Sequence, residues 1–172
     1  MLDRILIAIG AAVGACLLGG IAARAARPVP NPPVHLDHSI EANLSIPPDV
    51  ERSIDQACRN CHSNETRWPW YSRIPPASWL PARDVNRARG AMNLSEWSSR
   101  EGSSAPRAAA TLLAACADVR SGRMPLKGYR LLHPESRLSQ VEIDAFCGWA
   151  TSESQRLFAR KKPVKEEEKL KQ

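Results

Sequence analysis

The feature that constrains this chain most is the run Cys58-Arg59-Asn60-Cys61-His62, which has the spacing C-x-x-C-H. This spacing is the attachment signature of a c-type haem. Two thiols one helical turn apart can each bond to one of the two vinyl groups of the porphyrin. The histidine that follows the second thiol directly can then ligate the iron. We therefore predict one covalent haem c, attached through Cys58 and Cys61, with His62 as the proximal iron ligand.

The composition favours helices over strands. The 172 residues include 14 prolines and 9 glycines, and runs of β-branched residues are few. Both features argue against a sheet-rich fold. Apolar residues instead recur at helical spacing, as Val50, Ile54 and Ala57 do just before the first cysteine of the motif. We therefore predict an all-α fold.

An apolar run without a charged residue extends from Ile5 to Ala23. A helix needs about 20 apolar residues to cross a bilayer, whereas the core of a cleaved signal peptide has about 7–15. We predict an N-terminal transmembrane helix that anchors the chain in the inner membrane, with the rest in the periplasm, where haem is attached to such motifs. A cleaved signal peptide and a lipoprotein signal ending at Cys16 are alternatives. Arg24 and Arg27 argue against this orientation, because flanking positive charge normally favours the cytoplasm.

The composition divides the chain into four parts. Residues 1–24 form the anchor or signal segment, 25–48 a proline-rich linker, 49–160 the haem-binding domain and 161–172 a charged tail that we expect to be disordered. Within the domain, helices are expected over residues 49–61, around 81–90, from about 104 to 122 and from about 139 to 160. The last of these begins at the capping box Ser139-Gln140-Val141-Glu142.

Four short motifs accompany the C-x-x-C-H run: Ser63-Asn64-Glu65-Thr66, Trp68-Pro69-Trp70-Tyr71-Ser72, Pro76-Ala77-Ser78-Trp79 and Asn93-Leu94-Ser95-Glu96-Trp97. Together the five motifs resemble the bacterial haem-binding domain family, whose members are small, exported or membrane-anchored proteins similar to cytochrome c. The resemblance covers about residues 30–152. It implies a covalently bound c-type haem in a cytochrome c-like helical domain behind an N-terminal transmembrane helix.

Large aromatic side chains follow the haem motif closely. Trp68, Trp70, Tyr71 and Trp79 lie in a stretch that contains three prolines, which excludes a regular helix or strand. Such side chains supply much apolar area together with one polar group each. We predict an ordered loop whose four aromatic residues line the haem pocket. The alternative is a loop that packs on itself.

Met124 is the predicted distal iron ligand. It is followed by Pro125 and lies 62 residues after His62. A distal methionine has to come from a rigid, non-helical segment, and the proline supplies that rigidity. This Met-Pro pair resembles the methionine-ligand loop of small c-type cytochromes, and the family motifs place the same residues here. His133 and Met92 are the alternative ligands, and a methionine that merely fills the core is a third reading.

Two further cysteines, Cys116 and Cys147, lie on apolar faces of the predicted helices. In an oxidising compartment two such thiols can form a disulfide. Free cysteine is also among the most buried residue types and behaves as a small apolar residue. We expect Cys116 and Cys147 to be free and buried, with the disulfide as the alternative.

These observations predict a membrane-anchored periplasmic c-type cytochrome that transfers single electrons to and from an unidentified redox partner protein. Six-coordinate iron leaves no open position for a substrate, so we do not expect an enzyme. The net charge of +6 is scattered and has no recognition motif beside it, which argues against binding to nucleic acid. The main alternative is a haem-based sensor or ligand-binding module in which the distal ligand is displaced.

Two other classes use cysteine without haem. A thiol–disulfide oxidoreductase would place Cys58 and Cys61 beside a βαβ pattern, and the sequence has no such alternation. A structural zinc site could add Cys116 and Cys147, but this second pair lacks the C-x-x-C spacing. Both alternatives are weaker than the haem prediction.

Overall fold

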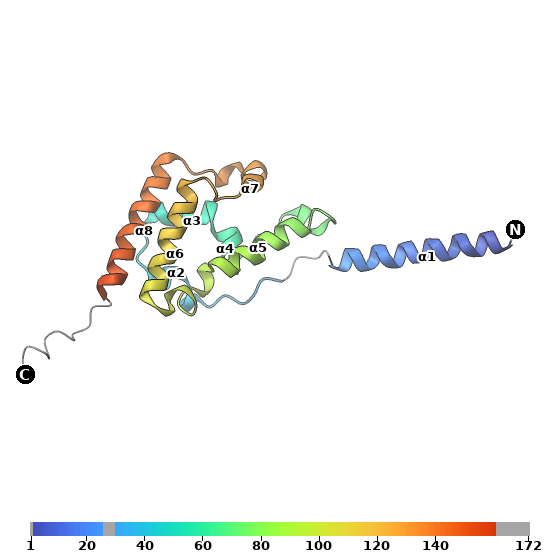
Figure 1. The fold of residues 1–172 in the computed structure, drawn as a ribbon, viewed down its shortest axis with the longest axis horizontal. Coiled ribbons are helices and arrows are strands. Elements are labelled where there is room, and N and C mark those ends of the chain that lie inside the picture. The colour runs from blue at the N-terminus through green and yellow to red at the C-terminus, as the bar shows by residue number, and fades with distance from the viewer. Residues whose placement is uncertain (1, 26–29, 161–172) are drawn as a thin grey trace, which may run out of the picture.

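The computed structural model describes residues 2–25 and 30–160, and no β-strand occurs among them (Figure 1). This confirms the predicted all-α class. The longer elements are α1 (Leu2–Ala25), α3 (Pro48–Ala57), α5 (Trp79–Ala91), α6 (Ala105–Arg120) and α8 (Gln140–Arg160). The short helices are α2 (Ile40–Asn43), α4 (Arg59–His62) and α7 (Lys127–Leu132), and the 3₁₀ turns are η1 (Leu36–His38), η2 (Trp70–Arg73), η3 (Leu94–Glu96), η4 (Glu101–Ser103) and η5 (Pro134–Ser136).

Helix α1 stands apart from the domain (Figure 1). Its segment Asp3–Gly20 is apolar, and none of it is buried inside the protein. By length and composition this helix is able to cross a membrane. The structure thus contains the N-terminal helix of membrane-spanning length that the apolar run predicted.

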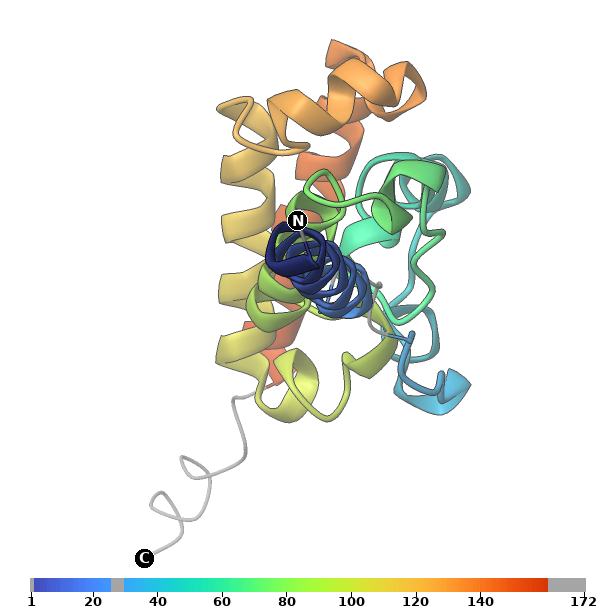
Figure 2. The ribbon, with the colours of Figure 1, turned by 90° about the vertical axis from the view of Figure 1, so that its right-hand side faces the viewer.

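The core of the domain lies between α6, α8 and α3. Figures 1 and 2 both show α6 and α8 side by side, and α3 packs against α8. The largest fully buried apolar side chains are Trp97, Ile40, Leu112 and Val50, and small residues such as Ala109 and Ala150 let the two long helices approach closely. The indole N–H of Trp149 donates to the carbonyl oxygen of Ser45 at 2.9 Å and ties α8 to the segment before α3.

Local signals in the sequence set most helix ends. Pro47 and Pro48 stand at the start of α3, where a fixed φ is tolerated. The Ser104 hydroxyl accepts from the backbone N–H of Arg107 and caps α6. Gly122, with φ +69°, follows the end of α6 in the left-handed conformation. The capping box before α8 is formed, because Glu142 accepts from the backbone N–H of Ser139 at 2.7 Å.

The packed unit begins before residue 49, within the segment predicted as a linker. Ile40 and Leu44 belong to the hydrophobic core. Farther upstream, the Asn31 side chain donates to the carbonyl oxygen of Thr66 at 2.8 Å. Residues 26–29 and the predicted tail 161–172 lie outside the described residues. The spacer between α1 and the domain is therefore much shorter than the composition suggested.

Cys116 and Cys147 form a disulfide, which corrects our expectation of two free thiols. The S–S distance is 2.07 Å and the Cα atoms lie 5.1 Å apart. The physical reason is the packing of α6 along α8, which places the two buried cysteines on facing stripes at a separation that a disulfide can bridge. Periodicity in the sequence put each cysteine on an apolar face, but it did not show that these faces meet.

Candidate functional site

The C-x-x-C-H run forms the turn of helix between α3 and the following loop. The backbone N–H groups of Cys61 and His62 both donate to the carbonyl oxygen of Cys58, at 3.1 and 2.9 Å. This helical turn brings the two cysteines and the histidine to one side of the segment. The local geometry therefore meets the requirement that C-x-x-C-H spacing places on a c-type haem.

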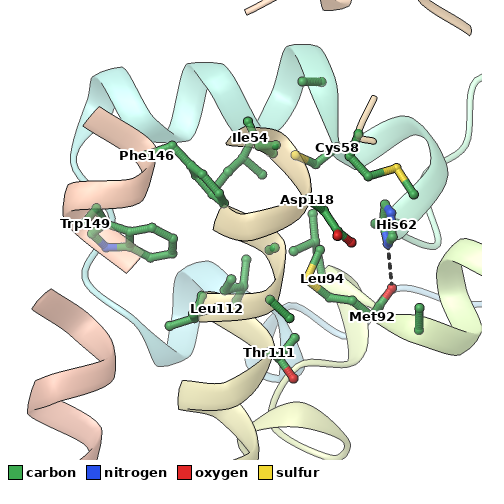
Figure 3. A pocket seen from close by; sticks show the side chains of 17 residues that line it. Ile54, Cys58, His62, Met92, Leu94, Thr111, Leu112, Asp118, Phe146 and Trp149 are labelled. Carbon is green, nitrogen blue, oxygen red and sulfur yellow. Dashed lines mark hydrogen bonds between the residues drawn. The ribbon is translucent and has the colours of Figure 1, made fainter. Parts of the chain in front are cut away.

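The ring of His62 is held in one tautomer. Its Nδ1 lies 3.1 Å from the carbonyl oxygen of Met92, just past the end of α5 (Figure 3). Because a carbonyl oxygen only accepts, Nδ1 carries the proton and Nε2 keeps its lone pair. Burial lowers the pKa of His62, so the neutral ring is favoured. His62 thus has the form in which an imidazole ligates a metal.

Two adjoining hollows flank His62. The inner hollow, of about 150 Å³, is lined mainly by apolar side chains and includes Cys58 (Figure 3). The outer hollow, of about 340 Å³, includes Cys61 and is bordered by the charged residues Arg83, Asp84 and Arg87. Both hollows are lined by His62 and Met124. Each cysteine thus faces one hollow, and the two predicted iron ligands belong to both.

This arrangement fits a c-type haem. A porphyrin needs a largely apolar cavity, an imidazole with a free nitrogen and two thiols on the same side, and the chain brings these together around His62. Met124 is held by its backbone N–H, which donates to the carbonyl oxygen of Asp118 at 3.1 Å. Met124, in the segment after α6, lines both hollows. Cys58, Cys61, His62 and Met124 are the residues that would hold the group.

The two alternative distal ligands have other contacts. Met92 lines the inner hollow, but its carbonyl oxygen accepts the hydrogen bond from His62 Nδ1. Met92 therefore lies on the same side of the hollow as the proposed proximal ligand. His133 lines neither hollow. Its Nε2 lies 3.1 Å from the hydroxyl oxygen of Tyr71, and its ring stacks on Tyr129 with centroids 4.3 Å apart. These contacts favour Met124 over both alternatives.

The two variable residues of the motif point outward and tie it to the surrounding elements. Arg59 forms ion pairs with Glu41 of α2, with Asp55 of α3 at 2.5 Å and with Glu65 at 3.2 Å. The Asn60 side chain donates to the hydroxyl oxygen of Tyr129 at 3.1 Å. The motif is therefore braced on its outer side by α2, α3 and α7.

The cysteines of the motif lack the properties that the two alternatives without haem require. Burial raises the pKa of Cys58 to about 12 and that of Cys61 to about 11, so both are thiols near neutral pH. A redox-active cysteine acts as the thiolate, usually at a lowered pKa. Among residues 2–25 and 30–160, no group of three or more His, Cys, Asp or Glu side chains could hold a metal ion. The disulfide also removes Cys116 and Cys147 as zinc ligands.

A buried network of polar side chains supports the histidine side of the site. Arg89 of α5 donates from Nε to the carbonyl oxygen of Ser63 at 2.8 Å and from Nη2 to the Thr66 hydroxyl at 2.9 Å. The Asn93 side chain donates to Asn64 Oδ1 at 2.9 Å. The network thus joins the segment after His62 to the segment that carries the Met92 carbonyl. It holds both ends of the His62 hydrogen bond in place.

The structure does not bring the four aromatic residues of the predicted pocket to the hollows. Trp68, Trp70, Tyr71 and Trp79 line neither of them. Trp70 and Trp79 are 75% and 54% exposed. The three prolines of this segment prevent a helix that would return along the domain, and the loop projects outward from the start of α5. Tyr71 is the one that contacts a candidate ligand, through its bond to His133.

Other residues line the hollows in their place, and local sequence patterns indicated only some of them. Helical spacing had put Ile54 on an apolar helix face, and it lines the inner hollow together with Leu112, Val119 and Phe146. Tyr129 of α7, which lines the outer hollow, had no such signal. The polar residues of the network around Arg89 were missed as well. Their burial depends on partners distant in the chain, which no local pattern shows.

Comparison with protein families places the chain in a known family. A family model described as "Haem-binding domain" matches residues 19–152, well over half of the chain. Comparisons with curated proteins and with solved structures found no match. The matched range contains the C-x-x-C-H run, the disulfide and Met124.

Proposed function

Because the chain belongs to the haem-binding domain family, we propose that it is a membrane-anchored c-type cytochrome. Its single haem is bound covalently through Cys58 and Cys61, its iron is held between His62 and Met124, and its role is one-electron transfer in the periplasm. The redox partner is another protein, and the chain itself is not an enzyme. Membership of the family establishes haem binding. Covalent attachment, the two iron ligands, electron transfer and the periplasmic location are inferred.

One observation carries the proposal. His62 and Met124 line both hollows, and each hollow also contains one cysteine of the motif. A noncovalent haem site has no need of two buried thiols on a single helical turn beside the ligand. A zinc or redox site has no need of a large apolar cavity beside them. Only a thioether-linked haem uses all four residues in this arrangement.

The protein residues have distinct tasks in such a site. When bound, the haem supplies an iron centre that exchanges one electron between ferric and ferrous states. The apolar lining of the inner hollow excludes water, and the Met92 carbonyl orients His62 and increases its basicity through Nδ1. Methionine ligation raises the reduction potential. If His62 and Met124 both held the iron, the site would favour electron transfer over binding of a substrate or gas.

The location rests on α1 and the haem motif together. Helix α1 is long and apolar enough to span a bilayer. Haem is attached to C-x-x-C-H motifs outside the cytoplasm, and the disulfide between Cys116 and Cys147 suits the same oxidising compartment. These features support an inner-membrane anchor with the domain in the periplasm.

Replacement of the distal ligand tests the electron-transfer role. We expect Met124→Ala to lower the reduction potential and to let ferrous protein bind carbon monoxide rapidly, while the wild type binds it slowly. The matched control is Met92→Leu, which removes a thioether from the same hollow and keeps the carbonyl that His62 uses. It should retain the wild-type spectrum and potential.

Two results would contradict the proposal. A five-coordinate or bis-histidine spectrum of the reduced wild type would exclude Met124 as the ligand. Carbon monoxide binding to the wild type as rapid as to Met124→Ala would instead favour the sensor or ligand-binding module.

A further inference from the structure

The loop that precedes α5 and the first turn of α5 expose large apolar side chains. Trp70, Ile74, Trp79 and Leu80 are 75%, 50%, 54% and 56% exposed. We call these four residues the loop face. A surface of this kind on an isolated soluble domain usually marks an interaction site. Neither hollow includes any of the four, so the haem site does not account for them.

The charged residues of the loop segment itself have one sign. Arg67 and Arg73 lie in the same segment, both exposed, and neither forms an ion pair with any residue that the structure describes. No acidic residue occurs between Glu65 and Asp84. The segment therefore combines exposed tryptophans with unpaired arginines, the pairing that is typical of protein segments in the interfacial region of an anionic bilayer.

A short connection keeps this segment close to the end of α1. Helix α1 ends at Ala25, and Asn31 is already fixed to the domain. The Asn31 side chain donates to the carbonyl oxygen of Thr66 at 2.8 Å and accepts from Arg89 at 2.8 Å. Six Cα–Cα steps from residue 25 to residue 31 span at most about 20 Å when fully extended. Thr66 directly precedes the loop, so the tether holds this side of the domain near the membrane end of α1.

We propose that the loop face is a membrane-docking surface, inserted in the headgroup region of the bilayer that α1 crosses. Arg67 and Arg73 pair there with the phosphates of anionic lipids. This inference rests on the part of the proposed function in which α1 is a retained anchor. Figure 1 shows the turn before α5 on the side of the domain that faces α1.

The tether favours lipid over a protein partner on this face. A redox partner on this face would have to fit between the domain and the bilayer, which a connection of about 20 Å holds close together. The bilayer itself lies beside the face without such a constraint. Arginines close to an anionic lipid surface are attracted to it. Docking also has a consequence for the haem site, because α5 runs from Trp79 of the loop face to Ala91, which lines both hollows. A docked loop face would fix the orientation of the haem pocket relative to the membrane.

Photo-crosslinking of the full holoprotein tests the docking. The protein is reconstituted in vesicles of phosphatidylethanolamine and phosphatidylglycerol, with p-benzoylphenylalanine in place of Ile74. The control carries the same group in place of Phe158, which is 48% exposed against 50% for Ile74 and lies at the far end of α8. We expect phospholipid adducts at position 74, detected by mass spectrometry, and none above background at position 158. Arg67→Ser/Arg73→Ser should reduce the yield at position 74 in these vesicles.

Several outcomes would overturn the docking. They are an absence of lipid adducts at position 74, equal yields at both positions, or crosslinks from position 74 to another copy of the chain in place of lipid. Loss of α1 by processing, seen in the mass of the purified protein, would overturn it as well. The reduced-state spectrum of the same sample reports on the cytochrome separately, so the docking and the haem ligation can fail independently.

Discussion

Two neighbouring stretches of this chain differ in how far the domain buries their side chains. Residues 63–66 directly follow His62 and carry polar side chains, of which Ser63, Asn64 and Thr66 are at most 6% exposed. Residues 67–80 follow them and carry the large aromatic side chains, yet Trp70 and Trp79 are more than half exposed. Size and apolarity therefore do not decide burial here. The partners that each side chain finds decide it.

The physical difference lies in how each stretch satisfies its polar groups. The first stretch is bound to Arg89, Asn93 and Ser95, so its buried groups have hydrogen-bond partners. In the second stretch, prolines remove backbone donors and prevent regular structure. Its large side chains consequently remain available to contact something outside the domain. The first stretch thus supports His62 from within the domain, and the second exposes large side chains on its surface.

The largest expected effect contrasts two tryptophans. Trp97 is 1% exposed in the core, whereas Trp70 is 75% exposed in the loop face. Trp97→Ala should lower the free energy of unfolding by about 3–5 kcal/mol, because it removes a fully buried ring and leaves a cavity. Trp70→Ala should change it by less than about 0.5 kcal/mol. Urea titration of each holoprotein in mild detergent measures both values, and similar losses for the two would contradict the comparison.

Removal of the disulfide comes next. Cys116→Ala/Cys147→Ala opens a link between residues 31 apart in sequence, which should lower the free energy of unfolding by about 3–4 kcal/mol. The link fastens α6 to α8, and neither cysteine belongs to the buried stretch or to the loop face. Wild-type protein treated with a reductant should show the same loss in a urea titration. A wild type that reductant leaves unchanged would mean that the disulfide does not form.

Arg89 tests the network that supports His62. Arg89→Lys cannot reproduce the forked hydrogen bonds to Ser63 and Thr66 and should lower the free energy of unfolding by about 2–3 kcal/mol. It should also shift the reduction potential, since the Met92 carbonyl would hold His62 less firmly. The matched control is Arg73→Lys in the exposed loop, which should change neither quantity. An unchanged potential in Arg89→Lys would restrict the network to a structural role.

The smallest effect concerns pH. Glu101 is 2% exposed, and its Oε2 has no hydrogen-bond partner among the described residues. Burial raises its pKa above the usual value of 4.5, although hydrogen bonds and the nearby Arg100 and Arg107 oppose the shift. The folded state therefore holds this proton more tightly than the unfolded state. Its contribution to stability is complete below pH 4.5 and is lost as the pH rises through the folded-state pKa.

Glu101→Gln removes this titration. We expect urea midpoints of the variant to fall less steeply than those of the wild type as the pH rises from about 4.5. Equal slopes for the two proteins would show that the carboxyl group of Glu101 is not held in an unfavourable environment.

Local patterns in the sequence predicted a large part of this molecule. The C-x-x-C-H spacing, the caps and the helical periodicity depend on residues a few positions apart, and the structure has α3, α5, α6 and α8 close to the expected ranges. Met124 was predicted from its proline and from the family motifs, and it stays a prediction as an iron ligand. Haem binding is confirmed through the family match.

Contacts between distant residues account for what the sequence did not predict. The bond between Arg89 and Asn31 joins residues 58 apart, and that between Asn31 and Thr66 joins residues 35 apart. The disulfide depends on how α6 and α8 are rotated about their own axes. The outward course of the tryptophan loop likewise depends on packing elsewhere in the domain. None of these leaves a periodic signal in a single sequence.

The most direct test of the central claim is a denaturing gel stained for haem. The claim is that Cys58 and Cys61 bind the haem covalently, so the wild type should retain a stained band at the mass of the chain after complete unfolding. Cys58→Ser/Cys61→Ser should lose that band even where the protein is still produced. An unstained wild type, or a double variant that stains as strongly, would contradict the account.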